Sequence, residues 1–269
     1  MRHARKFVGL LAGIAAVSGL STVPASAEST SDTAVENYVA LGDSYASGTG
    51  TREYFEDSGD CLRSPKAYPQ LWADSHEVSN FEFAACSGAV TDDVLADQLG
   101  ALSADTTLVT ISVGGNDVGF VDVITRCLTG DDAACDAAAT EATEKARSEL
   151  PAKLDATYSS IREAAPNAEV VVLGYPRINE MGDCGIPFYT ETKRQRINEG
   201  SDELAAVIAD RAAAAGFTFA DARPAFEGHG VCADDEWING PSNPVQESFH
   251  PDVDGHAQAY LPTLESVTG

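Results

Sequence analysis

Four short segments of the sequence carry groups that acyl transfer needs. They contain a serine hydroxyl, a glycine backbone, a carboxamide and an imidazole: Gly42-Asp43-Ser44-Tyr45, Cys86-Ser87-Gly88-Ala89, Gly114-Gly115-Asn116-Asp117 and Ser248-Phe249-His250-Pro251. A serine hydroxyl attacks an ester only after a base removes its proton, and neutral imidazole does so near pH 7. We therefore expect Ser44 to be a nucleophile and His250 its general base.

The same segments also offer hydrogen-bond donors for the negative charge that develops in this reaction. The tetrahedral intermediate carries an oxyanion, and each preorganised donor is worth roughly 3–4 kcal/mol in known enzymes. The backbone amides of Ser44 and Gly88 and the side-chain NH₂ of Asn116 are the candidate oxyanion hole. Glycine at position 88 suits a place where the backbone approaches a substrate closely.

The elements that must position these groups alternate along the chain. Short apolar runs predict strands, and amphipathic or Ala-rich runs predict helices: strands over 38–41, 81–84, 108–113, 169–173 and 217–220, and helices over 91–99, 135–165, 191–215 and 254–267. This alternation predicts an α/β fold with a parallel sheet covered on both faces. Ligands bind beyond the carboxyl ends of such strands, which is where the first three segments lie.

These motifs make the sequence recognisable. GDSY at 42–45, Gly88, GGND at 114–117 and the late His250 resemble, in order, the four blocks of the SGNH, or GDSL, hydrolase superfamily. The resemblance covers residues 38–262. The length, the six cysteines and the Phe-His-Pro context are most similar to its secreted actinobacterial lipases and esterases.

The resemblance has consequences for fold, activity and site. It implies a flavodoxin-like, three-layer α/β/α fold with three disulfides between cysteines that are neighbours in sequence. It also implies hydrolysis of carboxylic esters without a metal or a cofactor. Ser44 would be the nucleophile, His250 the base, and Gly88 and Asn116 part of the oxyanion hole.

One position departs from the pattern of many superfamily members. They carry an aspartate three residues before the histidine, and here that residue is Glu247. In the secreted lipases that this chain resembles, a main-chain carbonyl near the histidine holds the ring instead. The resemblance therefore implies a Ser44–His250 dyad, oriented by the carbonyl of Ser248 or Glu247. A triad through the Glu247 carboxylate is the alternative.

Other polar residues near the motifs are expected to be structural. Asp43 and Asp117 are adjacent to the proposed site residues, and we expect them to support the loops by hydrogen bonding. His256 falls where a helix should pack, so a structural role is favoured over a role as base. The segment from His250 to His256 has alternating metal donors but lacks the spacing of a calcium loop. We predict no metal site.

The start of the chain and the cysteines indicate export. Residues 1–27 have a basic start, an apolar run and an Ala-Ser-Ala end, which is typical of a signal peptide. Residues 28–269 are then predicted to form a single hydrolase domain. An even number of cysteines in an exported chain predicts three disulfides, although composition leaves every pairing open. We favour neighbours in sequence, listed as Cys61–Cys86, Cys127–Cys135 and Cys184–Cys232.

The strong negative charge limits the classes of partner. The net charge is −25, and it becomes −28 once residues 1–27 are removed, because they hold three basic and no acidic residues. Such a chain repels phosphate backbones, so we predict no nucleic-acid binding. No later segment is apolar enough to predict a stable membrane anchor. We expect a secreted, extracellular monomer acting on an ester or lipid.

The sequence therefore predicts a secreted lipase or esterase, and phospholipase A1 activity is compatible with the resemblance. One alternative is an acetylesterase that acts on acetylated carbohydrate with a smaller acyl pocket. The other is a non-catalytic, disulfide-stapled binding protein, which would have no need for Ser44, Gly88, Asn116 and His250 together. The loops that set chain length and head group follow no motif.

Overall fold

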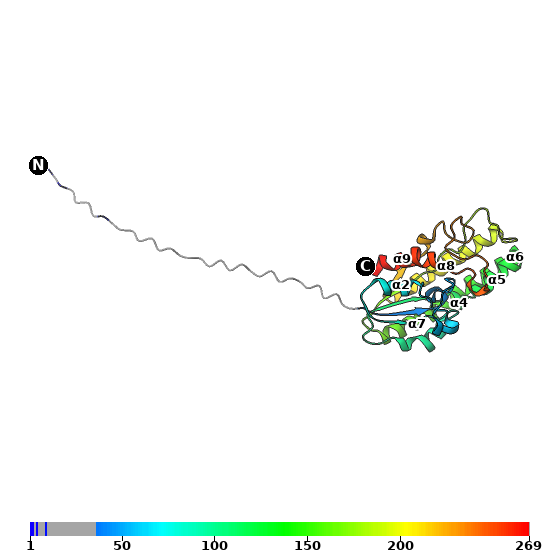
Figure 1. Cartoon of the computed structure of the whole chain (residues 1–269), viewed down its shortest axis with the longest axis horizontal. Coiled ribbons are helices and arrows are strands. Elements are labelled where there is room, and N and C mark those ends of the chain that lie inside the picture. The colour runs from blue at the N-terminus through cyan, green and yellow to red at the C-terminus, as the bar shows by residue number, and fades with distance from the viewer. Residues whose placement is uncertain (3, 5–8, 10–35, 269) are drawn as a thin grey trace. The chain divides into compact units, whose positions relative to one another are not determined.

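Five parallel strands form the sheet, in the order β2-β1-β3-β4-β5 (Figure 1). The strands are β1 (Glu36–Gly42), β2 (Val78–Phe83), β3 (Leu108–Ser112), β4 (Glu169–Leu173) and β5 (Thr218–Ala220). The computed structural model describes residues 1, 2, 4, 9 and 36–268. Most of the predicted signal peptide and residues 28–35 of the predicted domain lie outside the described residues. This strand order is that of flavodoxin-like sheets, so the predicted fold class is confirmed.

The central strands explain why the sheet forms. β3 is buried at every residue, and β4 exposes only Glu169. Near-continuous apolar strands are typical of parallel sheets with helices on both faces. β1 and β3 pair in parallel with Gly42 opposite Ser112, so both strands end at the same edge.

Helices form the two outer layers. They are α1 (Ser44–Ser47), α2 (Tyr68–Ser75), α3 (Thr91–Asp93), α4 (Gly115–Val118), α5 (Phe120–Thr129), α6 (Asp132–Ser148), α7 (Leu150–Ala164), α8 (Glu191–Ala214) and α9 (Leu261–Thr268). Figure 1 shows α7 on one side of the sheet and α2 and α9 on the other. Contacts agree, because α2 packs against α9 while α7 packs against α3 and α8. The predicted three layers are present.

Two helical regions bear on the sequence prediction. Pro151 is expected to break the helix over 135–165, and the structure divides that helix at Glu149 into α6 and α7, with Pro151 in the first turn of α7. α5 was not predicted, although its buried residues Val123, Ile124 and Cys127 have helical spacing. A short π-helical segment, Gly255–Tyr260, precedes α9.

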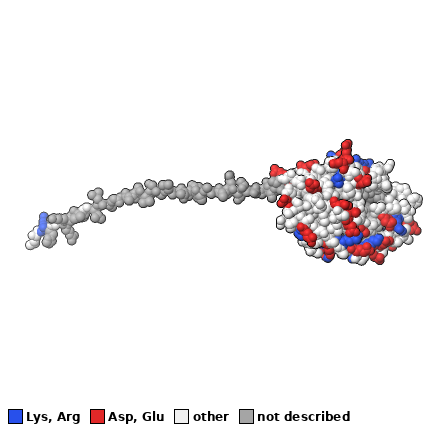
Figure 2. Space-filling model, turned by 90° about the horizontal axis from the view of Figure 1, so that it is seen from below, with Lys and Arg blue, Asp and Glu red and all other residues white. Residues whose placement is uncertain are grey.

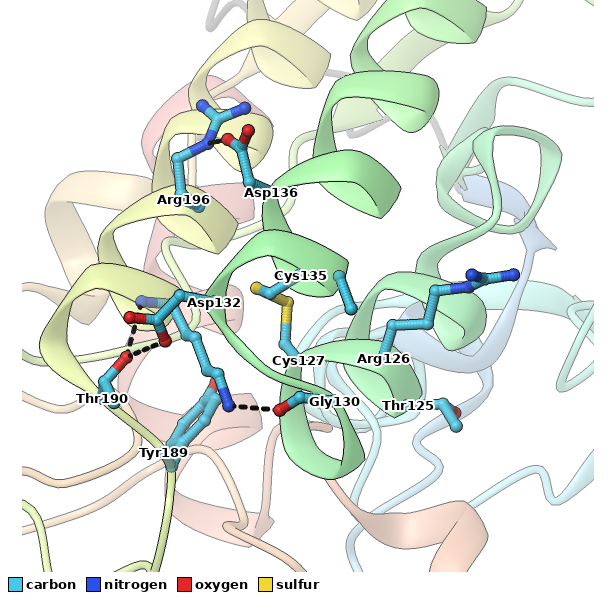
Figure 3. Close-up of a disulfide and its surroundings, with 12 residues drawn as sticks. Thr125, Arg126, Cys127, Gly130, Asp132, Cys135, Asp136, Tyr189, Thr190 and Arg196 are labelled. Atoms are coloured by element: carbon cyan, nitrogen blue, oxygen red, sulfur yellow. Dashed lines mark hydrogen bonds and ion pairs between the residues drawn. A yellow bond between two sulfur atoms is a disulfide. The ribbon is translucent and has the colours of Figure 1, made fainter.

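The disulfides and the acidic surface agree with what the cysteine count and the net charge predict. The three disulfides join the favoured pairs, listed as Cys61–Cys86, Cys127–Cys135 and Cys184–Cys232. The second of these connects α5 to α6 (Figure 3). Acidic side chains are spread over the face seen in Figure 2, with basic ones among them.

Candidate active site

Ser44 stands directly after β1, at the edge where the strands end. Gly42 has a φ of +125°, and a Cβ there would lie 2.3 Å from the carbonyl oxygen of Ser112, so the turn requires glycine. The Asp43 carboxylate then accepts a hydrogen bond from the Tyr45 N–H at 3.0 Å and caps α1. This local arrangement makes Ser44 the first residue of α1 and leaves it only 6% exposed.

His250 lies against Ser44 although the two are far apart in the sequence. The distance from His250 Nε2 to Ser44 Oγ is 2.7 Å, and His250 Nδ1 lies 2.9 Å from the carbonyl oxygen of Ser248. If Nδ1 carries the hydrogen and donates it to this carbonyl, Nε2 is free to accept a hydrogen bond from the serine hydroxyl. Burial lowers the pKa of His250 to about 4, so the ring is neutral at pH 7 and can act as a base.

The Glu247 carboxylate has other neighbours. The Tyr54 hydroxyl donates to its Oε1 at 2.8 Å, and Arg52 Nε lies 3.3 Å from its Oε2 without hydrogen-bond geometry. Among the described residues, no hydrogen bond joins this carboxylate to His250. The group at Nδ1 is thus the main-chain carbonyl of Ser248.

The three candidate oxyanion donors follow β1, β2 and β3. Within the described part of the chain, the N–H groups of Ser44 and Gly88 donate no hydrogen bond, and Gly88 has a φ of +83°. The Asn116 side-chain NH₂ donates one hydrogen to the Ala89 carbonyl at 3.0 Å. Its second hydrogen is available to an oxyanion. This bond fastens Asn116 to the loop of Gly88, so the donors are held near one another.

A cavity begins at Ser44 and extends between α5, α6 and α8. Ser44, Gly115 and Asn116 contribute to its lining near the sheet. The rest of its wall is mostly apolar or small and includes Phe120 of α5, Ala139, Ala142 and Ala146 of α6, and Arg196, Gly200 and Leu204 of α8. The arrangement combines an activated hydroxyl with a largely apolar space, and this combination can bind and cleave an ester that has an apolar part.

Comparison with known proteins places the chain in a family. Residues 40–258 match the model of the GDSL-like Lipase/Acylhydrolase family. The chain belongs to this family. The resemblance that the motifs carry is therefore confirmed, and the protein is a carboxylic ester hydrolase.

Relatives from Streptomyces match the chain over most of its length. Lipase 1 of Streptomyces coelicolor is 47% identical over 97% of this chain and 98% of its own. The crystal structure of the extracellular lipase from Streptomyces rimosus has a TM-score of 0.85 at 46% identity, covering 87% of this chain and all of that one. The crystal structure of phospholipase A1 from Streptomyces albidoflavus has a TM-score of 0.84 at 46% identity, covering 87% and 99%.

Tyr175 is a residue of this GDSL-family site that the motifs do not indicate. Its hydroxyl donates to Asp43 Oδ2 at 2.6 Å and accepts from the Gly115 N–H at 3.2 Å. It therefore links the segment of Ser44 to that of Asn116. Burial raises the pKa of Asp43 to about 7. The available signal was position, because Tyr175 follows β4 almost directly, as the other segments follow their strands.

The remaining polar residues near the site have structural partners. Asp117 accepts hydrogen bonds from the N–H and hydroxyl of Thr91 at 3.0 and 2.7 Å, and it pairs with Lys153 Nζ at 3.1 Å. His256 is fully buried, and its Nδ1 accepts a hydrogen bond from the Tyr68 N–H at 3.3 Å. Both residues have the supporting positions that we expected.

Within residues 36–268 and the few described residues before them, no three His, Cys, Asp or Glu side chains gather as metal ligands would. In the same part of the chain, no helix has the length and apolar character needed to cross a membrane.

Proposed function

We propose that this protein is a secreted serine esterase that cleaves lipid esters through an acyl-enzyme on Ser44, with His250 as general base. The single observation that carries the proposal is the 2.7 Å contact between Ser44 Oγ and His250 Nε2, combined with the contact of His250 Nδ1 to the Ser248 carbonyl. Together they give a hydroxyl with a base beside it and a fixed orientation for that base.

The reaction follows in two halves. His250 Nε2 takes the proton from Ser44 while Oγ bonds to the ester carbonyl carbon and the carbonyl oxygen becomes an oxyanion. The imidazolium then gives this proton to the departing alcohol oxygen as the carbon–oxygen bond breaks, which leaves the acyl group on Ser44. Water repeats the sequence: His250 deprotonates it, it attacks the acyl carbon, and the proton returns to Ser44 Oγ.

The amides of Ser44 and Gly88 and the free hydrogen of the Asn116 NH₂ would stabilise the oxyanion. Both amides lack other acceptors in the described chain, so the developing charge need not compete with an existing hydrogen bond. The Ala89 carbonyl holds Asn116 in place before substrate arrives. Donors that are already oriented need no reorganisation during the reaction.

Lipid esters are the favoured substrate class. The relatives named lipase and phospholipase A1 match this chain at 46–47% identity over nearly their whole lengths. The cavity beside Ser44 continues along two helices, which is more space than an acetyl group fills. The acetylesterase alternative is therefore less well supported. A non-catalytic binding protein is disfavoured by membership of a hydrolase family.

Export and assembly complete the proposal. Residues 1–27 would direct secretion and be removed, and three disulfides suit an oxidising extracellular location. We propose that residues 28–269 act as a monomeric hydrolase domain that does not bind nucleic acids, because their net charge is strongly negative.

The test is hydrolysis of p-nitrophenyl esters, from acetate to palmitate, by residues 28–269 and by the Ser44→Ala variant. We expect kcat to fall by about 10⁴-fold or more, because the attacking oxygen is lost. Ser148→Ala, an exposed serine on α6, is the matched control and should keep full activity. Activity of the folded Ser44→Ala variant close to that of the parent would overturn the proposal.

A further inference from the structure

The cavity beside Ser44 runs along two helices that lie side by side and point the same way. Arg196 on α8 contacts Asp136 on α6, and further along both helices Glu203 contacts Arg147. Residue numbers rise together in the two pairs, so α6 and α8 are parallel. The cavity is lined by residues from both helices over the same stretch, including Ala139 to Ala146 of α6 and Arg196 to Leu204 of α8.

The position of His250 decides which half of an ester enters this cavity. The alcohol oxygen must lie near His250 Nε2, because it receives its proton from there. The described residues that line the cavity include Ser44, Asn116 and Tyr175 of the site but not His250. With the alcohol half held beside His250, the cavity is the space left for the acyl half.

The dimensions of the wall suit an alkyl chain. From Ala139 to Ala146, α6 advances about 10 Å at roughly 1.5 Å per residue, close to the length of an extended chain of about eight carbons. Ala142 lies midway along this face, and Gly200 lines the cavity from α8. Small side chains on both helices leave the space open at that level.

Arg196 is the lining residue nearest the N-terminus of α8. Its Nε lies 2.7 Å from Asp136 Oδ1, and its Nη2 lies 3.3 Å from the Thr140 hydroxyl, so the side chain crosses from α8 to α6. Figure 3 shows this contact beside the Cys127–Cys135 disulfide that joins α5 to α6.

A second contact fastens the same ends of the helices. The Thr190 hydroxyl, which precedes α8, bonds to Asp132 Oδ1 at 2.9 Å (Figure 3). The helices are therefore tied to each other near their N-terminal ends.

We propose that this cavity is the acyl-chain site, that Ala142 determines its width and that Arg196 closes its outer end. The ligand is a saturated or weakly polar fatty acyl group. Its length of about eight carbons follows from the lined stretch of α6, which rises about 1.5 Å per residue. This inference rests on the proposed function, since it needs the acyl-enzyme on Ser44.

The first experiment narrows the cavity. For Ala142→Phe, we expect the ratio of kcat/KM for p-nitrophenyl octanoate to that for p-nitrophenyl acetate to fall at least about tenfold, because the phenyl ring occupies space that the longer chain needs. Ala137→Phe, on the exposed face of α6, is the matched control and should leave the ratio unchanged.

The second experiment opens the outer end. For Arg196→Ala, we expect the preferred acyl chain to become longer, with the ratio of dodecanoate to octanoate kcat/KM rising several-fold. Arg147→Ala removes another contact between α6 and α8, to Glu203, without touching the cavity, and should leave the ratio unchanged. If Ala142→Phe does not fold, this pair of variants decides alone.

The outcomes separate the two proposals. An active parent whose acyl-chain ratios stay the same in Ala142→Phe and Arg196→Ala would overturn the acyl site and leave the serine esterase proposal standing. A change confined to a series of alkyl acetates would place the alcohol half in the cavity and overturn it as well. An inactive parent, or an active Ser44→Ala variant, would instead overturn the proposed function.

Discussion

The segment that carries Ser44 and the segment that carries His250 meet at one pair of atoms, but they are positioned in different ways. Ser44 follows β1 within two residues, in a turn that Gly42 and the Asp43 side chain shape locally. His250 follows no strand of the sheet. Main-chain contacts with Asn239 hold it. The Asn239 N–H donates to the His250 carbonyl at 2.9 Å, and the Asn239 carbonyl accepts from the Phe249 N–H at 2.8 Å.

The two segments also place a buried carboxylate in different surroundings. Asp43 accepts from Tyr175 and from the Tyr45 N–H with no basic side chain bonded to it among the described residues, and burial raises its pKa to about 7. Glu247 is also buried, but it lies beside Arg52. Neither carboxylate contacts His250 in the described hydrogen-bond network. Glu247 is close to His250 in the sequence, but its carboxylate does not orient the His250 ring.

After the loss expected for Ser44→Ala, the next largest effect tests the oxyanion donors beside Ser44. For Asn116→Ala, kcat should fall by about 10²–10³-fold with little change in KM, because one oxyanion donor is lost. The measurement is steady-state hydrolysis of a short p-nitrophenyl ester. Asn80→Ala, at an exposed position of β2, is the control and should leave kcat unchanged. A loss below about threefold would remove Asn116 from the oxyanion hole.

The comparison explains which parts of the site the sequence could predict. Gly42 ends β1, and Ser44 and Asn116 follow β1 and β3 within a few residues, so the predicted strands place all three at one edge of the sheet. Tyr175 meets Asp43 across 132 positions, and its role depends on how β4 and β1 end relative to each other. No local pattern encodes such a contact.

The same reasoning applies to the orientation of the histidine. Sequence considerations left the Ser248 carbonyl, the Glu247 carbonyl and the Glu247 carboxylate open, because a one-residue change in loop path exchanges them. The loop path depends on Tyr45, whose hydroxyl donates to the Phe249 carbonyl at 2.7 Å. That bond spans the two segments and is visible only in the folded chain.

The next effect concerns the junction between the segments. Because burial lowers the pKa of His250 to about 4, kcat/KM should stay high as the pH falls to 5 and decline below about pH 4. The sign follows from the base, since protonated imidazole cannot accept the Ser44 proton. An imidazole with the ordinary pKa of about 6.5 would be neutral in only about 3% of molecules at pH 5. The pH profile of kcat/KM reports this group in the free enzyme.

Two other titrating groups, His256 and Asp43, can also change the pH profile of kcat/KM. The pKa of His256 is also lowered by burial, to about 3, so falling pH protonates the unfolded state first and reduces stability between about pH 6.5 and 3. Circular dichroism at each pH separates unfolding from inactivation. A change near pH 7 that disappears in Asp43→Asn would belong to Asp43. An acid limb centred near pH 6.5 in folded protein would contradict the buried, neutral histidine.

The smallest expected effect tests the His250 side. For Glu247→Gln, kcat should change by less than about threefold, because the Ser248 carbonyl remains at Nδ1 and the glutamine oxygen can still accept from Tyr54. The lost ion pair with Arg52 involves a largely exposed guanidinium and contributes about 1 kcal/mol or less. Tyr54→Phe, which removes the other contact of this carboxylate, should be similarly mild. A fall of about 10⁴-fold in folded Glu247→Gln, the size seen when a true triad acid is lost, would mean that the carboxylate reaches His250 during turnover. The two segments would then both depend on buried carboxylates, and the contrast between them would not hold.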